Sequence, residues 1–328
     1  MTRFGIVGAG LMGHGIAVDL ARGGHRVDVH DADDRVMASF AARVAEALSV
    51  CGLTGAEIAA VRSRITAVFD VATAVGEADV VVEAVPERME VKHAVLAAVE
   101  AVAAPDVAIW SNTSVLSVTE VAGSMIRPGR LVGVHWWNPP YVVPLVEVAP
   151  GARTDEGYVR AADELLTALG KTTVRLRQDV PGFIGNRLQF AMVREALHLL
   201  DAGVCDPATI DVVVRSGFGL RLAAVGPMEN ADYIGLDLTR SILRSLSPHL
   251  SAATDSFPVL DDLLAGGRGG KVAGGGLLAW PPGRAEEVAR RLDSGIRRNL
   301  AGATDGEPVA ISRPGWTADT TGDAGAGC

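Results

Sequence analysis

The sequence has few cysteines, no excess of basic charge and no long apolar run, and each absence excludes a class of protein. Acidic residues outnumber basic ones by 39 to 30, so the chain lacks the basic excess of a nucleic-acid-binding protein. The cysteines Cys51, Cys205 and Cys328 are odd in number and far apart in the chain. This pattern favours free thiols in a reducing compartment over a disulfide framework or a metal site. We therefore expect no nucleic-acid partner and no bound metal.

No apolar run reaches the ~18 residues that a membrane helix requires. The first 30 residues already form a strand–turn–helix pattern, so they do not read as a cleavable secretory signal. We expect a cytoplasmic protein without a membrane partner. The 328 residues, 48% of them hydrophobic, suffice for two domains with buried cores.

Residues 3–13 read as a short apolar strand, a glycine turn and the start of a helix. In this Gly-x-Gly-x-x-Gly pattern Gly8 permits the turn, Gly10 lets a pyrophosphate approach the backbone, and Gly13 lets the helix pack against the strand. The helix that follows would point its free N–H groups at the phosphates. The stretch predicts a dinucleotide-binding turn; the alternative is an ordinary strand, turn and helix.

A second strand pattern at residues 26–30 ends at Asp31, which lies 18 residues after Gly13. An acidic residue at this distance can accept a hydrogen bond from a ribose 2′-hydroxyl. Because a carboxylate would repel a 2′-phosphate, the position favours NAD over NADP. The alternative is that Asp31 is a surface aspartate without a ligand.

Strand and helix patterns alternate along the first half of the chain. This alternation predicts an α/β fold with a Rossmann-type doubly wound sheet. Ligands of such sheets bind beyond the carboxyl ends of the strands, where the glycine turn, Asp31 and His135 all fall. After the first two strands, strands are expected at 65–69, 79–85, 108–110, 131–134, 145–148 and 173–177, and helices at 34–64 with a break at 52–54, 87–102 and 155–169.

Beyond residues 179–182 the strand patterns cease. The sequence predicts an N-terminal dinucleotide-binding domain at 1–180 and a C-terminal all-α domain at 181–301. The composition of residues 302–328, rich in Gly, Ala, Thr, Asp and Pro, is typical of a disordered tail. In the all-α domain, helices are expected at 182–202, 207–215, 232–246, 258–264 and 284–300.

His135 is the candidate catalytic base. It follows a predicted strand, and the ordinary pKa of histidine suits proton transfer near neutral pH. Glu147 lies in the next strand pattern, and if the two strands are neighbours its carboxylate can orient the imidazole. On its position alone, a single histidine such as His135 is as often a residue without a catalytic function as a catalytic one. Ser114, Asn138 and Asn186 are other candidates, and they are equally compatible with turn, capping or solvent-exposed roles.

The motifs, taken in order, resemble the L-3-hydroxyacyl-CoA dehydrogenase family. The likeness extends from residue 3 to about residue 280. It implies a Rossmann domain, a helical domain that forms a homodimer, and NAD-dependent oxidation of a 3-hydroxyacyl substrate in fatty-acid metabolism. The segments that support it are the glycine turn and residues 83–87, 111–114, 135–147 and 179–187.

The resemblance also implies a role for each site residue. His135 would be the catalytic base and Glu147 its orienting partner. Ser114 and Asn186 would hold the substrate oxygen, and Asn138 would support the catalytic site. The residues that would contact NAD are Gly8, Gly10, Leu11, Met12, Gly13, Asp31, Glu87, Lys92, Ser114 and Asn138.

Some features differ from the fatty-acid-degrading members of that family. Trp136 and Trp137 stand where those members often have two phenylalanines, and residues 274–280 lack the aromatics of a common Gly-Phe-Tyr motif. Residues 138–144 are more similar to the branch that contains gulonate and carnitine dehydrogenases and lambda-crystallin. The arm at 34–64 holds arginines but no lysine. The acyl carrier is therefore CoA, a carrier protein or absent. The alternatives are a dehydrogenase of a free 3-hydroxy acid and a non-catalytic NAD-binding protein.

Overall fold

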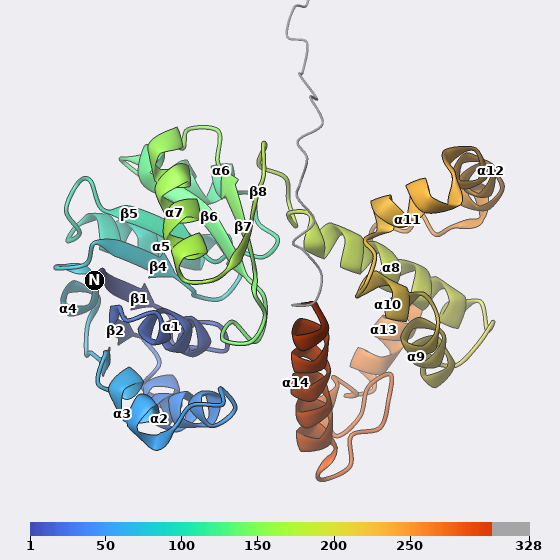
Figure 1. The fold of residues 1–328 in the computed structure, drawn as a ribbon, viewed down its shortest axis with the longest axis horizontal. Helices are drawn as coiled ribbons and strands as arrows, with labels where there is room; N and C mark the ends of the chain where they lie inside the picture. Colours follow the sequence, from blue (N-terminus) through green and yellow to red (C-terminus); the bar gives the residue numbers. More distant parts are fainter. Residues whose placement is uncertain (304–328) are drawn as a thin grey trace, which may run out of the picture.

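The computed structural model describes residues 1–303, which form an eight-stranded sheet covered by helices and then a helical half (Figure 1). The strand order is β3-β2-β1-β4-β5-β6-β7-β8, and β7 runs antiparallel to β6 while the other neighbouring pairs are parallel. The predicted fold class, a doubly wound sheet followed by an all-α part, is confirmed. The strands are β1 (Arg3–Val7), β2 (Arg26–His30), β3 (Ile65–Ala67), β4 (Val80–Glu83), β5 (Ala108–Ser111), β6 (Leu131–Trp136), β7 (Leu145–Pro150) and β8 (Thr172–Arg175).

Two hydrophobic cores lie on the two faces of the sheet. Successive residues of a strand point to opposite faces, so Val80 and Val82 join one core and Val81 joins the other. Because both faces are buried, the central strands are continuously apolar rather than alternating. One core contains residues of α1 (Gly13–Arg22), α2 (Asp34–Ser49), α3 (Gly55–Arg62) and α7 (Glu156–Ala168), and the other those of α4 (Val71–Val75), α5 (Met89–Glu100) and α6 (Val118–Val121).

The predicted arm is a helical hairpin, α2 and α3, which packs against α1. The break at 52–54 is present, and Thr54 forms a capping box with Glu57. The Thr54 hydroxyl accepts a hydrogen bond from the Glu57 N–H at 3.3 Å, and the Glu57 carboxylate accepts one from the Thr54 N–H at 2.7 Å. The local sequence thus determines where this hairpin turns.

The helical half differs from the prediction at two helix boundaries, and it has helical residues at 218–222 and 227–231 that were not predicted. The long helix predicted from residue 182 begins at Gly185, because Gly182 and Phe183 have positive φ angles of 80° and 52°. The helix predicted at 232–246 is two helices, since Gly235 has a φ of 98° that an α-helix cannot contain. The helices are α8 (Gly185–Asp201), α9 (Pro207–Ser216), α10 (Phe218–Leu222), α11 (Pro227–Ile234), α12 (Leu236–Leu246), α13 (Pro258–Ala265) and α14 (Arg284–Ala303).

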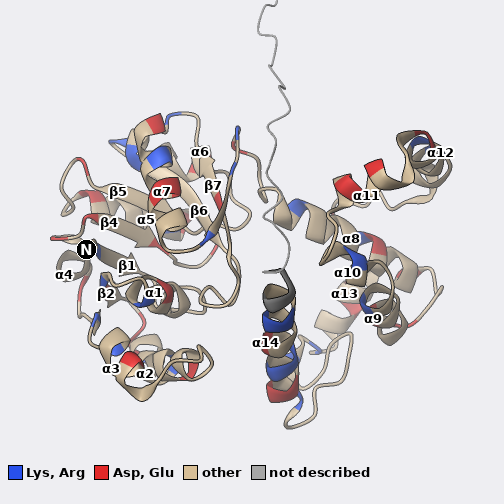
Figure 2. Ribbon diagram, in the orientation of Figure 1, with Lys and Arg blue, Asp and Glu red and all other residues tan. Residues whose placement is uncertain are grey.

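The surface of the helical half exposes many large apolar side chains. Leu188 and Phe190 of α8 are 62% and 56% exposed, and residues of α10 and α12 are similarly open. Acidic and basic residues are interspersed over both halves of the chain (Figure 2). The tail predicted at 302–328 lies outside the described residues, except that 302 and 303 are the last residues of α14.

Candidate functional site

The carboxyl ends of five parallel strands meet at one edge of the sheet. Val7 at the end of β1 pairs with His30 on one side and with Glu83 on the other, and Glu83 pairs with Ser111. β6 extends beyond this row to His135 and Trp136. The segments that were predicted to bind a ligand therefore lie side by side along one edge, as the parallel order requires.

The glycine turn between β1 and α1 has the shape that a dinucleotide needs. Gly8 has a φ of 103°, and a Cβ there would lie 2.5 Å from the Ala84 carbonyl oxygen. A Cβ on Gly13 would lie 1.8 Å from the Gly8 carbonyl oxygen. A Cβ on Gly10 would meet nothing within 4 Å, so its place is open to a ligand. Two glycines are thus required by packing, and the third leaves room for a pyrophosphate.

Asp31 follows β2 at the same edge. Its Oδ2 atom accepts a hydrogen bond from the Ala9 N–H at 2.8 Å, and its Oδ1 atom accepts one from the Asp33 N–H at 2.9 Å. An ionised carboxylate has about four acceptor positions, so capacity for a ribose hydroxyl remains. Leu11, 67% exposed, and the half-buried Met12 complete the turn. These residues fit NAD, which would be held by the turn and by Asp31.

A buried ionic network lies below the ends of β4 and β5. Lys92 and Glu83 are both fully buried, and the Lys92 Nζ lies 2.8 Å from Glu83 Oε1 and 3.2 Å from Glu87 Oε2. The Ser111 hydroxyl also donates to Glu83, at 2.5 Å. The protein encloses the ammonium group of Lys92, which binds these two carboxylates. A direct contact between Lys92 and the cofactor stays a prediction.

Glu87 shapes the loop after β5. Its Oε1 atom accepts hydrogen bonds from the Thr113 hydroxyl, from the Ser114 N–H at 2.8 Å and from the Val115 N–H at 2.9 Å. Burial raises the pKa of Glu87, but Lys92 and these hydrogen bonds outweigh that effect and lower it to about 2. Glu87 is therefore ionised near neutral pH and fixes the backbone of Ser114.

His135 and Glu147 face each other across the antiparallel pair β6 and β7. The His135 Nδ1 and Glu147 Oε2 atoms are 2.9 Å apart, and the two residues are 4% and 1% exposed. The other carboxylate oxygen accepts the Ile184 N–H at 2.9 Å and the Gly185 N–H at 3.0 Å, at the beginning of α8. Burial raises the pKa of Glu147, but the hydrogen bonds from His135, Gly185 and Ile184 together lower it below its usual value.

The tautomer of His135 follows from these contacts. An ionised carboxylate can only accept hydrogen bonds, so the Nδ1 atom of His135 donates to Glu147 and bears a proton. In the neutral imidazole the Nε2 atom is then a free base. Among residues 1–303, no protein group hydrogen-bonds to Nε2. The arrangement can therefore accept a proton from a ligand at the edge of the sheet.

Two aromatic rings flank the imidazole. Phe183 stacks on His135 with ring centroids 5.2 Å apart and an interplanar angle of 19°, and the Trp137 ring lies 5.4 Å away. Gly185 lies against Trp137, because a Cβ there would come within 2.2 Å of the indole. The positive φ of 52° at Phe183 is uncommon for a residue other than glycine. The linker between the sheet and α8 thus completes the wall around His135.

The polar candidates are only partly brought together. Asn186 of α8 donates from its side-chain nitrogen to the Ser114 carbonyl oxygen at 2.9 Å, so the two loops meet. Asn138 is exposed on the loop after β6, and its expected support of the site stays a prediction.

Among residues 1–303, no group of His, Cys, Asp or Glu has metal-binding geometry, and no helix combines the length and apolarity needed to cross a bilayer.

Three residues lie in segments that the sequence analysis singled out, but it gave none of them a role in the site. Glu83 anchors Lys92, Phe183 stacks on His135, and the Asn112 side-chain oxygen accepts the Trp136 N–H at 3.0 Å. A carboxylate that ends an apolar strand is a signal that could have predicted the role of Glu83. The roles of Phe183 and Asn112 depend on contacts between distant segments, which the motifs that contain them do not reveal.

Comparison with known proteins gives consistent matches. The model for the 3-hydroxyacyl-CoA dehydrogenase NAD-binding domain matches residues 3–180, and that for the C-terminal domain matches residues 182–280. The chain is 34% identical to 5-formyl-3-hydroxy-2-methylpyridine 4-carboxylate 5-dehydrogenase of Mesorhizobium japonicum, over 90% of this chain and 97% of that protein. It is 39% identical to L-carnitine dehydrogenase of Pseudomonas aeruginosa, over 68% and 70%. A crystal structure of a 5-formyl-3-hydroxy-2-methylpyridine 4-carboxylic acid 5-dehydrogenase, described as an NAD⁺-dependent dismutase, superimposes with a TM-score of 0.85 and 30% identity over 92% of this chain and 99% of that one.

Proposed function

Because the chain belongs to the 3-hydroxyacyl-CoA dehydrogenase family and is an NAD-dependent oxidoreductase, we propose that His135 is its general base. The substrate is a secondary alcohol at carbon 3 of a 3-hydroxyacyl compound. NAD, when bound, supplies the acceptor for the hydride that leaves carbon 3. The observation that supports this proposal most directly is the buried His135–Glu147 pair, 2.9 Å apart at the ligand-binding edge of the sheet.

The proposed proton transfer uses the free nitrogen of His135. Its Nε2 atom takes the proton of the 3-hydroxyl group as the ketone forms, and Nδ1 keeps its proton on Glu147. The charge of Glu147 stabilises the imidazolium that results, since an opposite charge nearby favours the protonated imidazole. In the reducing direction the same Nε2 proton passes to the substrate oxygen. Phe183 restricts the imidazole to one orientation.

We assign the orientation of the substrate oxygen to Ser114 and Asn186. Asn186 already contacts the Ser114 backbone, and both residues are half-buried beside the predicted position of the nicotinamide. The glycine turn and Asp31 would hold the dinucleotide, and Glu87 and Lys92 would fix the loop beneath it. None of these assignments requires a metal ion.

Replacing His135 with alanine tests the assignment of the base. Turnover should fall by ~10²–10⁴, the usual contribution of general acid–base catalysis. NAD affinity should change little, because the glycine turn and Asp31 hold the cofactor. A His135→Ala variant with wild-type turnover and normal NAD binding would show that the base lies elsewhere in the cleft.

The acyl carrier is the open part of the proposal. Some arginines of the arm are occupied within the protein, since Arg43 donates to the Val36 carbonyl oxygen and Arg64 to the Ala21 carbonyl oxygen. This observation favours the second candidate, a dehydrogenase of a free 3-hydroxy acid, and L-carnitine dehydrogenase is among the relatives. A panel of acetoacetyl-CoA, carrier-linked substrates and free 3-hydroxy acids, followed by NADH absorbance, separates the candidates. A role in fatty-acid metabolism follows only if the CoA or carrier-linked compounds are preferred, and a non-catalytic role only if none is turned over.

We further propose that residues 181–301 act as a domain that forms a homodimer. The exposed apolar residues of α8, α10 and α12 are more numerous than a monomer surface usually shows in one region. Light scattering should give twice the chain mass at micromolar concentration, and a monomer would contradict the proposal.

We also propose a cytoplasmic location, in line with the free thiols of Cys51 and Cys205; cell fractionation tests it.

A further inference from the structure

Trp136 lies on the face of the sheet opposite to His135. The two residues are consecutive in β6, so their side chains point in opposite directions. Trp136 is almost fully buried in the core beneath α1, where its indole N–H donates to Asp19 Oδ2 at 3.1 Å. Its backbone N–H is held by Asn112. Because the two residues are adjacent in one strand, a shift of Trp136 would also shift His135.

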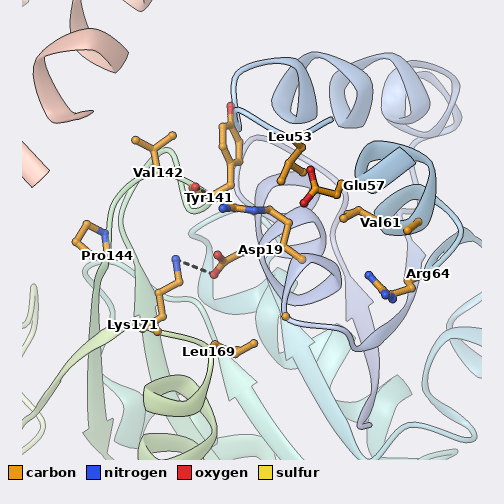
Figure 3. A pocket seen from close by; sticks show the side chains of 14 residues that line it. Asp19, Leu53, Glu57, Val61, Arg64, Tyr141, Val142, Pro144, Leu169 and Lys171 are labelled. Carbon is orange, nitrogen blue, oxygen red and sulfur yellow. Dashed lines mark hydrogen bonds and ion pairs between the residues drawn. The ribbon is translucent and has the colours of Figure 1, made fainter. Parts of the chain in front are cut away.

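Asp19 also forms a buried ion pair. The Lys171 Nζ lies 2.8 Å from Asp19 Oδ2, and the two side chains are only 7% and 9% exposed. Figure 3 shows the ammonium group pointing at the carboxylate, beside a cavity of about 480 Å³. Burial raises the pKa of Asp19, an effect that Lys171 and Trp136 oppose. No step of the proposed chemistry uses this pair.

Lys171 makes two further contacts, both with the loop that follows β6. Its Nζ donates to the Pro140 carbonyl oxygen at 2.6 Å and to the Val143 carbonyl oxygen at 3.3 Å. One ammonium group thus joins the loop at 137–144 to α1. This loop begins with Trp137, which packs beside His135. The Asp19–Lys171 pair therefore contacts both Trp136, the neighbour of His135 in β6, and the loop that carries Trp137.

We propose that the Asp19–Lys171 pair, through Trp136 and the loop at 137–144, positions His135 relative to the cofactor helix α1. The inference rests on the proposed function, in which hydride transfer and proton transfer occur between ligands held by α1 and His135. Asp19 and Lys171 are positioning residues, because they act through Trp136 and the loop at 137–144, on the face of the sheet opposite to His135. Misplacement of reacting groups by about 1 Å can cost ~10²-fold in rate.

Two variants remove different parts of this connection. Lys171→Met removes the ion pair with Asp19 and the bonds to the loop. Trp136→Phe removes the five-membered ring of the indole with its N–H and keeps a six-membered aromatic ring. The measurement is the single-turnover rate of hydride transfer from NADH at saturating substrate, together with the dissociation constant of NADH. We expect each variant to lose ~10–100-fold in the hydride-transfer rate with an NADH dissociation constant within about twofold of wild type.

Glu100→Gln is the matched control. Glu100 and Arg130 form a similarly buried pair, with side chains 6% and 2% exposed, just before β6 and at the other end of the strand from His135. This variant should lower Tm but leave the single-turnover rate unchanged. The inference is overturned if Lys171→Met and Trp136→Phe keep the wild-type rate, or if Glu100→Gln reduces it as much as they do. If Lys171→Met fails to fold, Trp136→Phe decides.

A second readout does not depend on activity. If the pair positions His135, the surroundings of the imidazole should change when the pair is broken. NMR spectra of labelled histidine, assigned with His135→Ala, should show displaced His135 ring signals in Lys171→Met and Trp136→Phe but not in Glu100→Gln. If wild type turns over no member of the substrate panel, the proposed function fails. The NMR comparison then tests the positioning role alone, and unchanged His135 ring signals in both variants overturn it.

Discussion

Replacing Glu147 with glutamine should inactivate the enzyme by reversing the tautomer of His135. The carboxylate accepts from His135 on one oxygen and from the Ile184 and Gly185 N–H groups on the other. A glutamine has one accepting oxygen and one donating nitrogen. Because the two backbone groups can only donate, the glutamine oxygen must face them, and its NH₂ group must face His135.

The Nδ1 atom of His135 then has to accept a hydrogen bond, so the imidazole proton moves to Nε2. That nitrogen can no longer take a proton from the substrate. A reversed tautomer in a comparable histidine–carboxylate pair lowers kcat by about 10⁴. We therefore expect Glu147→Gln to lose ~10³–10⁴ in kcat, equivalent to ~4–5.5 kcal/mol of transition-state stabilisation.

The assay is kcat by NADH absorbance, together with the NAD dissociation constant, which should remain near the wild-type value. The ¹⁵N shifts of His135 report directly which nitrogen bears the proton, and they should exchange between wild type and Glu147→Gln. A variant that retains more than about a tenth of the wild-type kcat, or that keeps the proton on Nδ1, would refute the reasoning. The losses in Glu147→Gln and His135→Ala should not add, because both residues act through one imidazole.

Four further substitutions have defined outcomes. The pKa of Glu87 is about 2 in the folded protein, against 4.5 unperturbed, so its ionised form stabilises the fold. This stabilisation is complete above about pH 4.5 and is lost as the pH falls toward 2. Glu87→Gln should flatten that part of the stability–pH curve, measured by urea unfolding. Gly13→Ala should lower Tm, because its Cβ would lie 1.8 Å from the Gly8 carbonyl oxygen, whereas Gly10→Ala should keep Tm and weaken NAD binding; calorimetry and NAD titration check both. Asp31→Ala should reduce the preference for NAD over NADP in kcat/KM, and equal values for the two cofactors in wild type would contradict the role of Asp31.

Local sequence determined most of the secondary structure of the first half. Continuous apolar runs identified the buried strands, and the glycine turn was recognised because the spacing of Gly8, Gly10 and Gly13 is a local property. The Thr54–Glu57 capping box is likewise a local feature, because its two residues are only three apart in the chain. Prediction was less accurate in the helical half, where Gly235 divides one apparent helix into two. The regular spacing of apolar residues, from which helices are predicted, does not show that a residue between them, such as Gly235, has a positive φ angle.

The order of the strands was decided by the tertiary structure. The sequence placed His135 and Glu147 in successive strands, but their contact depends on the antiparallel pairing of β6 with β7. Similarly, Phe183 reaches His135 only because the linker turns at Gly182. Periodicity describes one element at a time and contains no information on which elements pair.

By itself the sequence determined the class of fold, the cofactor and the identity of the candidate base, because each depends on residues that are close in the chain. Only the tertiary structure decided which groups surround that base. Asp19, Lys171 and Trp136 come from three separate segments, and no spacing between them is conspicuous in the sequence. They meet because α1 covers the face of the sheet to which Trp136 points, and Lys171, just before β8, reaches the same place. There a buried charge is stable only when another segment supplies its partner.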